Sequence, residues 1–180
     1  MKRPISRAAL CFLVLMLGAS SSQGQAKAEA GFDQLKTLLG EWEGVGEDGI
    51  RRMVSYQLLS GGTALMEILA PENEPDMVTV YNVDGDHLAL THYCSANNQP
   101  RMKTEALSAV PQKLVFAFAG GTNIPSPDAH MVGLSVTFED QDHFTQSWTW
   151  KEAGNDHVST FRFTRRKRSG VSDVHLVSDR

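Results

Sequence analysis

Three side chains with metal-binding or nucleophilic chemistry lie in the middle and later parts of the sequence. His92 and Cys94 are separated by one residue, so both point to the same face of an extended strand, and His130 falls on a later alternating segment. Imidazole and thiolate groups suit zinc or copper, which makes these residues a candidate metal site. Cys94 could also be a nucleophile with His92 or His130 as its base. No second His-x-His or Cys-x-x-Cys pair supports a metal, so we expect none.

Motifs of the common enzyme classes are missing from the sequence. It contains no G-x-S-x-G nucleophile elbow, no phosphate-binding loop and no dinucleotide fingerprint. We therefore expect a binding protein with no catalytic residues. The alternative is an enzyme in which His92 or His130 acts as general acid or base.

The elements that must position these residues are short strands. From residue 40 to about 166, apolar residues alternate with polar ones, and turn residues such as Gly61-Gly62, Asp84-Gly85-Asp86, Gly120-Gly121 and Gly154-Asn155 interrupt the pattern. The strands are expected at residues 41–46, 52–59, 63–70, 77–83, 87–95, 102–109, 113–119, 130–139, 143–151 and 158–165.

Ten strands joined by local hairpins must hide their edges. We predict an all-β fold, a closed antiparallel up-and-down barrel of 8–10 strands with a short N-terminal helix over residues 32–39. A Greek-key sandwich is the alternative, although only residues 70–76 and 122–129 offer a connection long enough for it.

The alternation also predicts which side chains point inward. A barrel of this size is either filled by its side chains or holds one small ligand. We expect a small hydrophobic or amphipathic ligand, with aromatic and aliphatic side chains around it and three polar groups orienting its head. The predicted ligand-binding residues are His92, His130, Gln146, Trp148, Trp150, Phe116, Phe118, Leu90 and Leu134. Glu67 joins them if Leu65 and Leu69 point inward, and mutual pairing of the polar groups in a filled interior stays open.

The N-terminus has the pattern of an export signal. Lys2, Arg3 and Arg7 precede an apolar run at residues 8–17, which is too short to span a bilayer, and small residues lead to a cleavage position after Ala26. The predicted organisation is therefore a signal peptide (1–26), a segment with the short helix (27–39), the barrel (40–166) and a flexible polar tail (167–180). We expect a periplasmic or secreted protein.

The net charge and the cysteine count limit which partners and disulfides are expected. The net charge of the 180 residues is −4, and cleavage after Ala26 removes three of the 17 basic residues and none of the 21 acidic ones, leaving −7. An acidic protein is a poor binder of phosphate backbones, so no nucleic-acid partner is expected. No second apolar run approaches membrane-spanning length, so no integral membrane span is expected. Cys94 would be the single thiol of the cleaved chain and could form no internal disulfide.

A short string at the start of the first strand resembles a known signature. Gly40-Glu41-Trp42 resembles the G-x-W signature of the calycin superfamily, the lipocalins and their relatives. The resemblance implies a barrel closed at one end by a short helix, where a basic side chain from the last strand, here Arg162 or Arg165, covers the tryptophan ring. The longer string from Gly40 to Gly46 is similar to the G-x-W-x-G-x-G opening of nitrobindin-type barrels.

That second resemblance implies haem as a possible cofactor. Nitrobindin-type proteins ligate haem iron through a histidine on a late strand, and His157 is the one candidate near the start of the last predicted strand. Its surroundings do not match the family's motif, and it lies beside a predicted turn. Haem therefore stays an alternative to a hydrophobic ligand.

Overall fold

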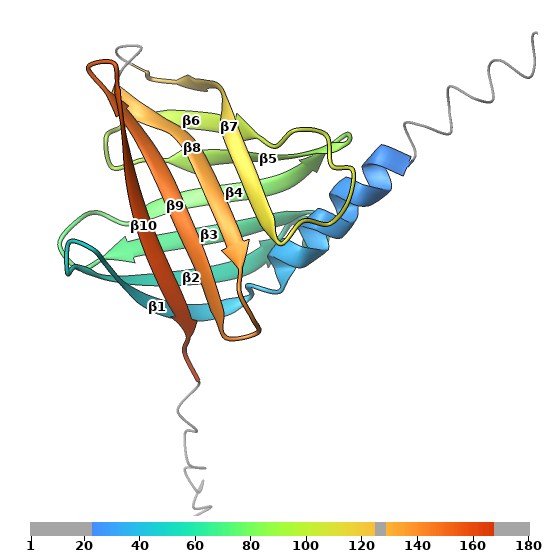
Figure 1. Cartoon of the computed structure of the whole chain (residues 1–180), viewed down its shortest axis with the longest axis horizontal. Coiled ribbons are helices and arrows are strands. Elements are labelled where there is room, and N and C mark those ends of the chain that lie inside the picture. The colour runs from blue at the N-terminus through green and yellow to red at the C-terminus, as the bar shows by residue number, and fades with distance from the viewer. Residues whose placement is uncertain (1–22, 125–128, 168–180) are drawn as a thin grey trace, which may run out of the picture.

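A closed ring of ten antiparallel strands with a helix across one end makes up the computed structural model, which describes residues 23–124 and 129–167 (Figure 1). Each strand pairs with the next along the chain, and β1 pairs with β10, for example Trp42 with Arg165. The strands are β1 (Gly40–Gly46), β2 (Arg51–Leu59), β3 (Ala64–Pro71), β4 (Met77–Asp84), β5 (His87–Tyr93), β6 (Gln99–Lys103), β7 (Lys113–Thr122), β8 (Ala129–Phe138), β9 (His143–Glu152) and β10 (Asn155–Arg165). The predicted all-β closed barrel is confirmed, with ten strands, and the Greek-key alternative is wrong.

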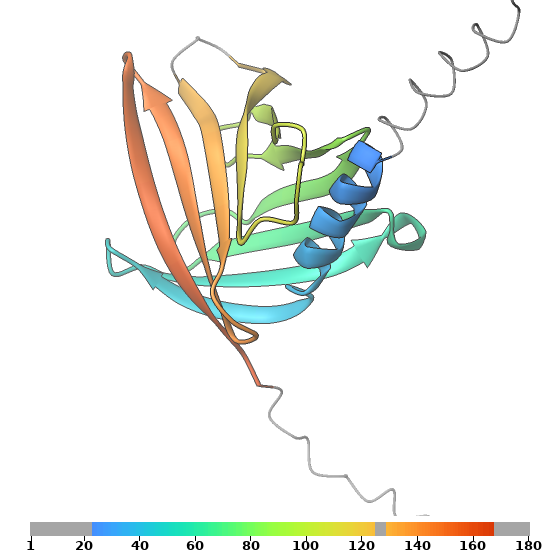
Figure 2. The same ribbon diagram turned by 45° about the vertical axis from the view of Figure 1, so that its right-hand side comes forward.

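The N-terminal helix lies across the end of the barrel where β2 turns into β3 through the 3-10 turn η1 (Ser60–Gly62) (Figure 2). Among the described residues it covers 23–36, so it begins earlier and ends earlier than the predicted 32–39. Ala28, Phe32 and Leu35 are buried at helical spacing and pack toward the barrel interior, whereas Leu39 is 36% exposed. Burial of Ala28 extends the apolar stripe one turn toward the N-terminus, which the sequence prediction missed.

The sixth strand differs most from the prediction. It covers Gln99–Lys103 and not 102–109, because the turn after β5 is tighter than expected: Asn97 adopts a φ of 61°, and its backbone N–H donates to the Cys94 carbonyl. Gly120-Gly121, expected as a turn, lies within β7. A Cβ at Gly121 would lie 2.9 Å from the Gln99 carbonyl oxygen, so this position needs a glycine for close approach between strands.

The helix end of the barrel is closed around Trp42. Its indole donates from Nε1 to the Leu38 carbonyl at 2.7 Å, and Phe144 packs edge-on at a ring-centroid distance of 4.7 Å. The Arg165 guanidinium lies 4.0 Å from the Trp42 ring, a cation–π contact. The predicted basic cover is therefore present and comes from Arg165, whereas Arg162 pairs with Glu139.

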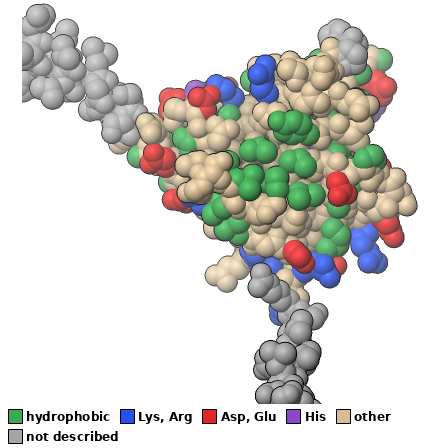
Figure 3. Space-filling model, turned by 180° about the vertical axis from the view of Figure 1, so that it is seen from behind, with side chains coloured by type: hydrophobic (Ala, Val, Ile, Leu, Met, Phe, Trp, Pro, Cys, Tyr) green, Lys and Arg blue, Asp and Glu red, His purple; other side chains and the backbone are tan. Residues whose placement is uncertain are grey.

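The outer surface of the barrel carries apolar side chains as well. Met66 lies opposite Val80, and Ile68 lies opposite Val78, on the outward face of β3 and β4, and all four are half-buried. Figure 3 shows hydrophobic side chains gathered on the face opposite to that seen in Figure 1. Among the described residues, no helix has the length and apolar character needed to cross a membrane.

Candidate functional site

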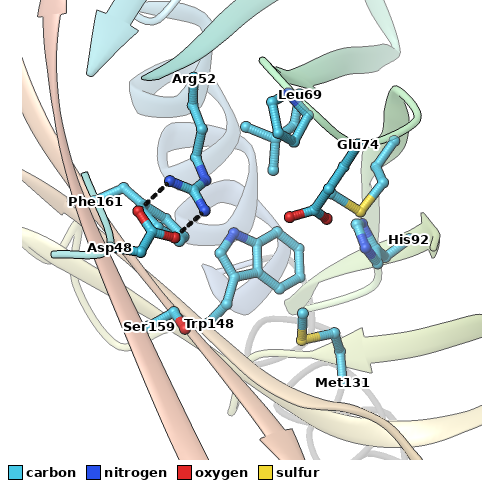
Figure 4. Close-up of a pocket in the computed structure, with 11 residues that line it drawn as sticks. Asp48, Arg52, Leu69, Glu74, His92, Met131, Trp148, Ser159 and Phe161 are labelled. Atoms are coloured by element: carbon cyan, nitrogen blue, oxygen red, sulfur yellow. Dashed lines mark hydrogen bonds and ion pairs between the residues drawn. The ribbon is translucent and has the colours of Figure 1, made fainter. Parts of the chain in front are cut away.

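A cavity of about 250 Å³ opens at the end of the barrel away from the helix (Figure 4). The turn after β1, the turn after β3 and residues of seven strands (β2 to β5 and β8 to β10) surround it. Its lining residues are Asp48, Arg52, Leu69, Pro71, Glu74, Met77, His92, Met131, Trp148, Ser159 and Phe161.

The walls of the cavity are largely apolar. Leu69 and Met77 face it from β3 and β4, and Trp148 and Phe161 face it from β9 and β10. Each occupies an inward position in its strand's alternation, and all four are at most 8% exposed. These side chains can bind an apolar molecule by excluding water from it.

An ion pair stands at the mouth. Asp48 accepts from both terminal nitrogens of Arg52, at 2.9 and 2.6 Å, and the guanidinium lies 4.2 Å from the Phe161 ring. The hydrogen bond from Arg52 lowers the pKa of Asp48 to about 2. A Cβ at Gly46 would lie 2.7 Å from Asp48 Oδ1 and 2.8 Å from the Arg52 guanidinium, so the last glycine of the first strand leaves room for this pair.

The inner end of the cavity is formed by His92 against Trp148. The two rings lie 4.5 Å apart between centroids, and His92 Nδ1 lies 2.9 Å from the hydroxyl oxygen of Thr79. His92 is 1% exposed, and burial lowers its pKa to about 4, so the imidazole is neutral at neutral pH. Among the described residues, its Nε2 has no hydrogen-bond partner.

A row of polar side chains crosses the barrel interior beneath the cavity. Tyr56, Glu67, Thr79 and His92 are register neighbours on β2, β3, β4 and β5, and all four are buried. The inward pointing of Glu67, which the sequence left open, is therefore established. Because these four side chains lie opposite one another on neighbouring strands, they form a polar layer beneath the apolar cavity, which we call the floor.

Glu67 is the centre of the hydrogen bonds in this floor. Its Oε2 accepts from the hydroxyls of Tyr56 and Tyr81, each at 2.7 Å, and from Gln146 Nε2 at 2.8 Å. Burial raises the pKa of Glu67, and the three hydrogen bonds oppose that rise. Gln146 comes from the opposite wall and also accepts from Trp148 Nε1 at 3.2 Å, so the floor holds the indole that lines the cavity.

The structure brings two of the nine predicted ligand-binding residues to the cavity wall, His92 and Trp148. Four others, Gln146, Phe116, Leu90 and Leu134, are buried deeper in the interior. His130 is buried against Phe118, at a centroid distance of 4.6 Å, and Phe118 is 40% exposed. Trp150 is half-buried near the end of β9.

The candidate metal ligands do not converge. Cys94 is half-buried at the edge of the core, and within residues 23–124 and 129–167 no three His, Cys, Asp or Glu side chains form a cluster suited to a metal ion.

The mouth residues Asp48, Arg52 and Glu74 were missed by the sequence prediction. A signal existed for one of them: Arg52 has the same parity as Val54 and Tyr56, so alternation places a charged side chain on an inward face. Asp48 and Glu74 lie in turns, where alternation assigns no direction. Only the closed fold brings those turns over the lumen.

A haem iron needs an axial ligand that faces the cavity holding the porphyrin. By alternation, His157 lies on the same face of β10 as Ser159 and Phe161, but it is exposed and does not line the cavity. The volume of about 250 Å³ is below the roughly 300–1,000 Å³ of pockets for drug-sized ligands, and the Asp48–Arg52 pair stands in the mouth. The described residues therefore do not fit a porphyrin.

Comparison with known proteins supports the fold. No family model matches the chain, and a search of curated protein sequences gave no match. Among solved structures, the crystal structure of Rv2717c from M. tuberculosis is similar with a TM-score of 0.55 and 15% identity, covering 76% of this chain and 98% of that one. A protein of unknown function from the DUF3598 family of Nostoc punctiforme gives a TM-score of 0.41 at 13% identity, covering 73% of this chain and 48% of that one. At 15% identity the likeness to Rv2717c concerns the barrel fold alone.

Proposed function

We propose that this protein binds a small, largely apolar molecule in the cavity at the open end of its barrel, with one polar atom of that molecule hydrogen-bonded to His92. The observation that carries the proposal is the buried His92 Nε2, which borders the cavity without a partner among the described residues. A buried polar nitrogen without a hydrogen bond costs about 1–3 kcal/mol, and a ligand in the cavity would remove that cost.

The size and lining of the cavity support a small ligand. About 250 Å³ with aliphatic, thioether and aromatic walls suits a single substituted aromatic ring or a short aliphatic chain. At the mouth, Asp48 and Arg52 neutralise each other, so neither needs a charged ligand, and a ligand passes this pair on its way into the cavity.

The test uses acetophenone, an aromatic ring with one carbonyl oxygen, as probe and residues 27–180 as protein, with isothermal titration calorimetry as readout. We expect saturable one-to-one binding, lost in Ser159→Phe, which fills the cavity from β10. The matched control is Thr160→Phe on the adjacent outward position, which should bind as the wild type does. Absence of saturable binding, or equal binding by the two variants, refutes the proposal.

Haem is the competing occupant in the same preparation. Addition of haem is expected to give no Soret band of a ligated iron. A Soret band that disappears in His157→Ala would show that haem, and not a small apolar molecule, is the ligand.

We also propose a calycin-like relationship and export. The first is supported by the ten-stranded barrel, the helix at one end and the Arg165–Trp42 contact. Export is supported by the sequence of residues 1–26, and cleavage after Ala26 would leave the buried helix residues Ala28, Phe32 and Leu35 in place. N-terminal sequencing of protein from the periplasm or medium should read Lys27 first, and an intact N-terminus in the cytoplasm would refute export.

A further inference from the structure

We propose that the cavity selects neutral molecules that carry a hydrogen-bond acceptor, such as a ketone, ester or amide carbonyl, and that His92 Nε2–H is the donor that recognises it. The inference rests on the proposed function and adds the chemical class of the ligand. It follows from the hydrogen bond between His92 and Thr79 and from the charges around the cavity.

The first step is the tautomer of the His92 ring. A neutral imidazole has one N–H and one acceptor nitrogen, so Thr79 either donates to Nδ1 or accepts from it. Within the described residues, the Thr79 hydroxyl has no hydrogen-bond partner other than His92, and Thr79 is 1% exposed.

Counting unsatisfied groups decides between the two tautomers. If Nδ1 carried the proton, the buried Thr79 hydroxyl would have no acceptor and Nε2 would also lack a partner. If the hydroxyl donates to Nδ1, the proton resides on Nε2, and that N–H is the one donor left for a ligand. The first arrangement leaves two buried groups without partners and the second leaves one, the Nε2–H, so the second arrangement is favoured.

The second step is the charge of the site. The ionisable side chains that line the cavity besides His92 are Asp48, Arg52 and Glu74, and they sum to one negative charge. Arg52 is paired with Asp48, whereas Glu74 is exposed at the rim and belongs to none of the ion pairs of the described residues. An anionic ligand would meet uncompensated negative charge.

The third step excludes a donor or cation as the preferred group at the inner end. Trp148, the neighbour of His92, already donates its Nε1–H to Gln146. The negative charge of Glu74 favours a cation over an anion at the mouth, but a ligand ammonium at the inner end would face the His92 N–H donor and apolar walls. A neutral acceptor is the group that this end of the cavity satisfies.

The test compares two probes of nearly equal shape: acetophenone, and isopropenylbenzene, in which a CH₂ group replaces the carbonyl oxygen. We expect wild-type protein to bind acetophenone about tenfold more tightly, as one hydrogen bond implies, with benzoate and benzylammonium weaker than both. In His92→Phe, which keeps an aromatic ring beside Trp148, acetophenone and isopropenylbenzene should bind with about equal affinity.

A direct readout of the tautomer complements the titrations. Long-range ¹H–¹⁵N correlation spectra of histidine-labelled protein, with His92 assigned by its loss in His92→Phe, should show the Nε2–H form. In Thr79→Val, which removes the hydroxyl, the spectrum should report a mixture of tautomers, and the probe preference should shrink.

The outcomes separate the inference from the proposed function. Equal binding of the two neutral probes, tighter binding of a charged probe, or an Nδ1–H tautomer in the wild type overturns the inference while the cavity remains a binding site. Failure of all four probes to bind overturns the proposed function and the inference with it.

Discussion

The buried carboxyl of Glu67 offers a quantitative test of the barrel interior. Burial raises its pKa and three hydrogen bonds to Oε2 lower it, with burial the larger effect. The carboxyl therefore keeps its proton in the folded protein at pH values where the unfolded chain has lost it. Replacing Glu67 by Gln removes the titration and leaves an acceptor oxygen for Tyr56 and Tyr81.

The sign and size follow from proton linkage. Above the ordinary carboxyl pKa of 4.5, the folded state binds more protons at this site than the unfolded state, so folding is weakened as pH rises. The free energy of unfolding of the wild type, measured relative to Glu67→Gln, should fall by up to about 1.4 kcal/mol per pH unit until the folded carboxyl ionises. The unpaired amide nitrogen introduced by Gln adds a cost that does not vary with pH.

The assay is urea unfolding of wild type and variant from pH 4 to pH 8, followed by tryptophan fluorescence. Glu139→Gln is the control of opposite sign: Glu139 accepts from Thr145 and Arg162, which lowers its pKa, so the wild type should gain stability relative to that variant as pH rises. A difference for Glu67→Gln that is flat or increases with pH would show that the hydrogen bonds outweigh burial, and the reasoning would be wrong.

Three further predictions concern other parts of the structure. His92 has its pKa lowered to about 4, so the wild type should lose about 3 kcal/mol of stability relative to His92→Phe as pH falls from 6.5 to 4, measured in the same unfolding assay; a difference that does not change with pH would contradict the prediction. Arg165→Ala removes the cation–π contact with Trp42 and three hydrogen bonds to backbone carbonyls, and should lower the free energy of unfolding by about 1–3 kcal/mol; no change would show that the closed end does not need it. Gly44→Ala places a Cβ 2.5 Å from a carbonyl oxygen of β10 and should cost about 1–3 kcal/mol, whereas Gly133→Ala, whose Cβ meets nothing nearer than 3.4 Å, should cost less, and thermal unfolding compares the two.

The sequence by itself determined the ten strands and the closure of the barrel. Alternation with period two fixes which side chains point inward, and hairpin turns between successive strands leave a closed ring as the way to cover both edges. The contact of Trp42 with a basic side chain of the last strand was expected from the calycin resemblance, which left Arg162 and Arg165 open, and the structure assigns it to Arg165. The sixth strand was displaced because a left-handed Asn97 tightened a turn that the sequence pattern made longer.

Tertiary structure alone decided the floor and the mouth of the cavity. Alternation places Gln146 inward and puts Glu67 on the same face as Leu65 and Leu69, but it does not show that a side chain from β9 meets one from β3 across the lumen, because that depends on barrel diameter and on how strands tilt. The ion pair of Asp48 with Arg52 likewise depends on where a turn folds over the opening. Contacts between residues far apart in sequence are set by the closed ring, and the one-dimensional pattern that specifies each strand carries no measure of the distance across it.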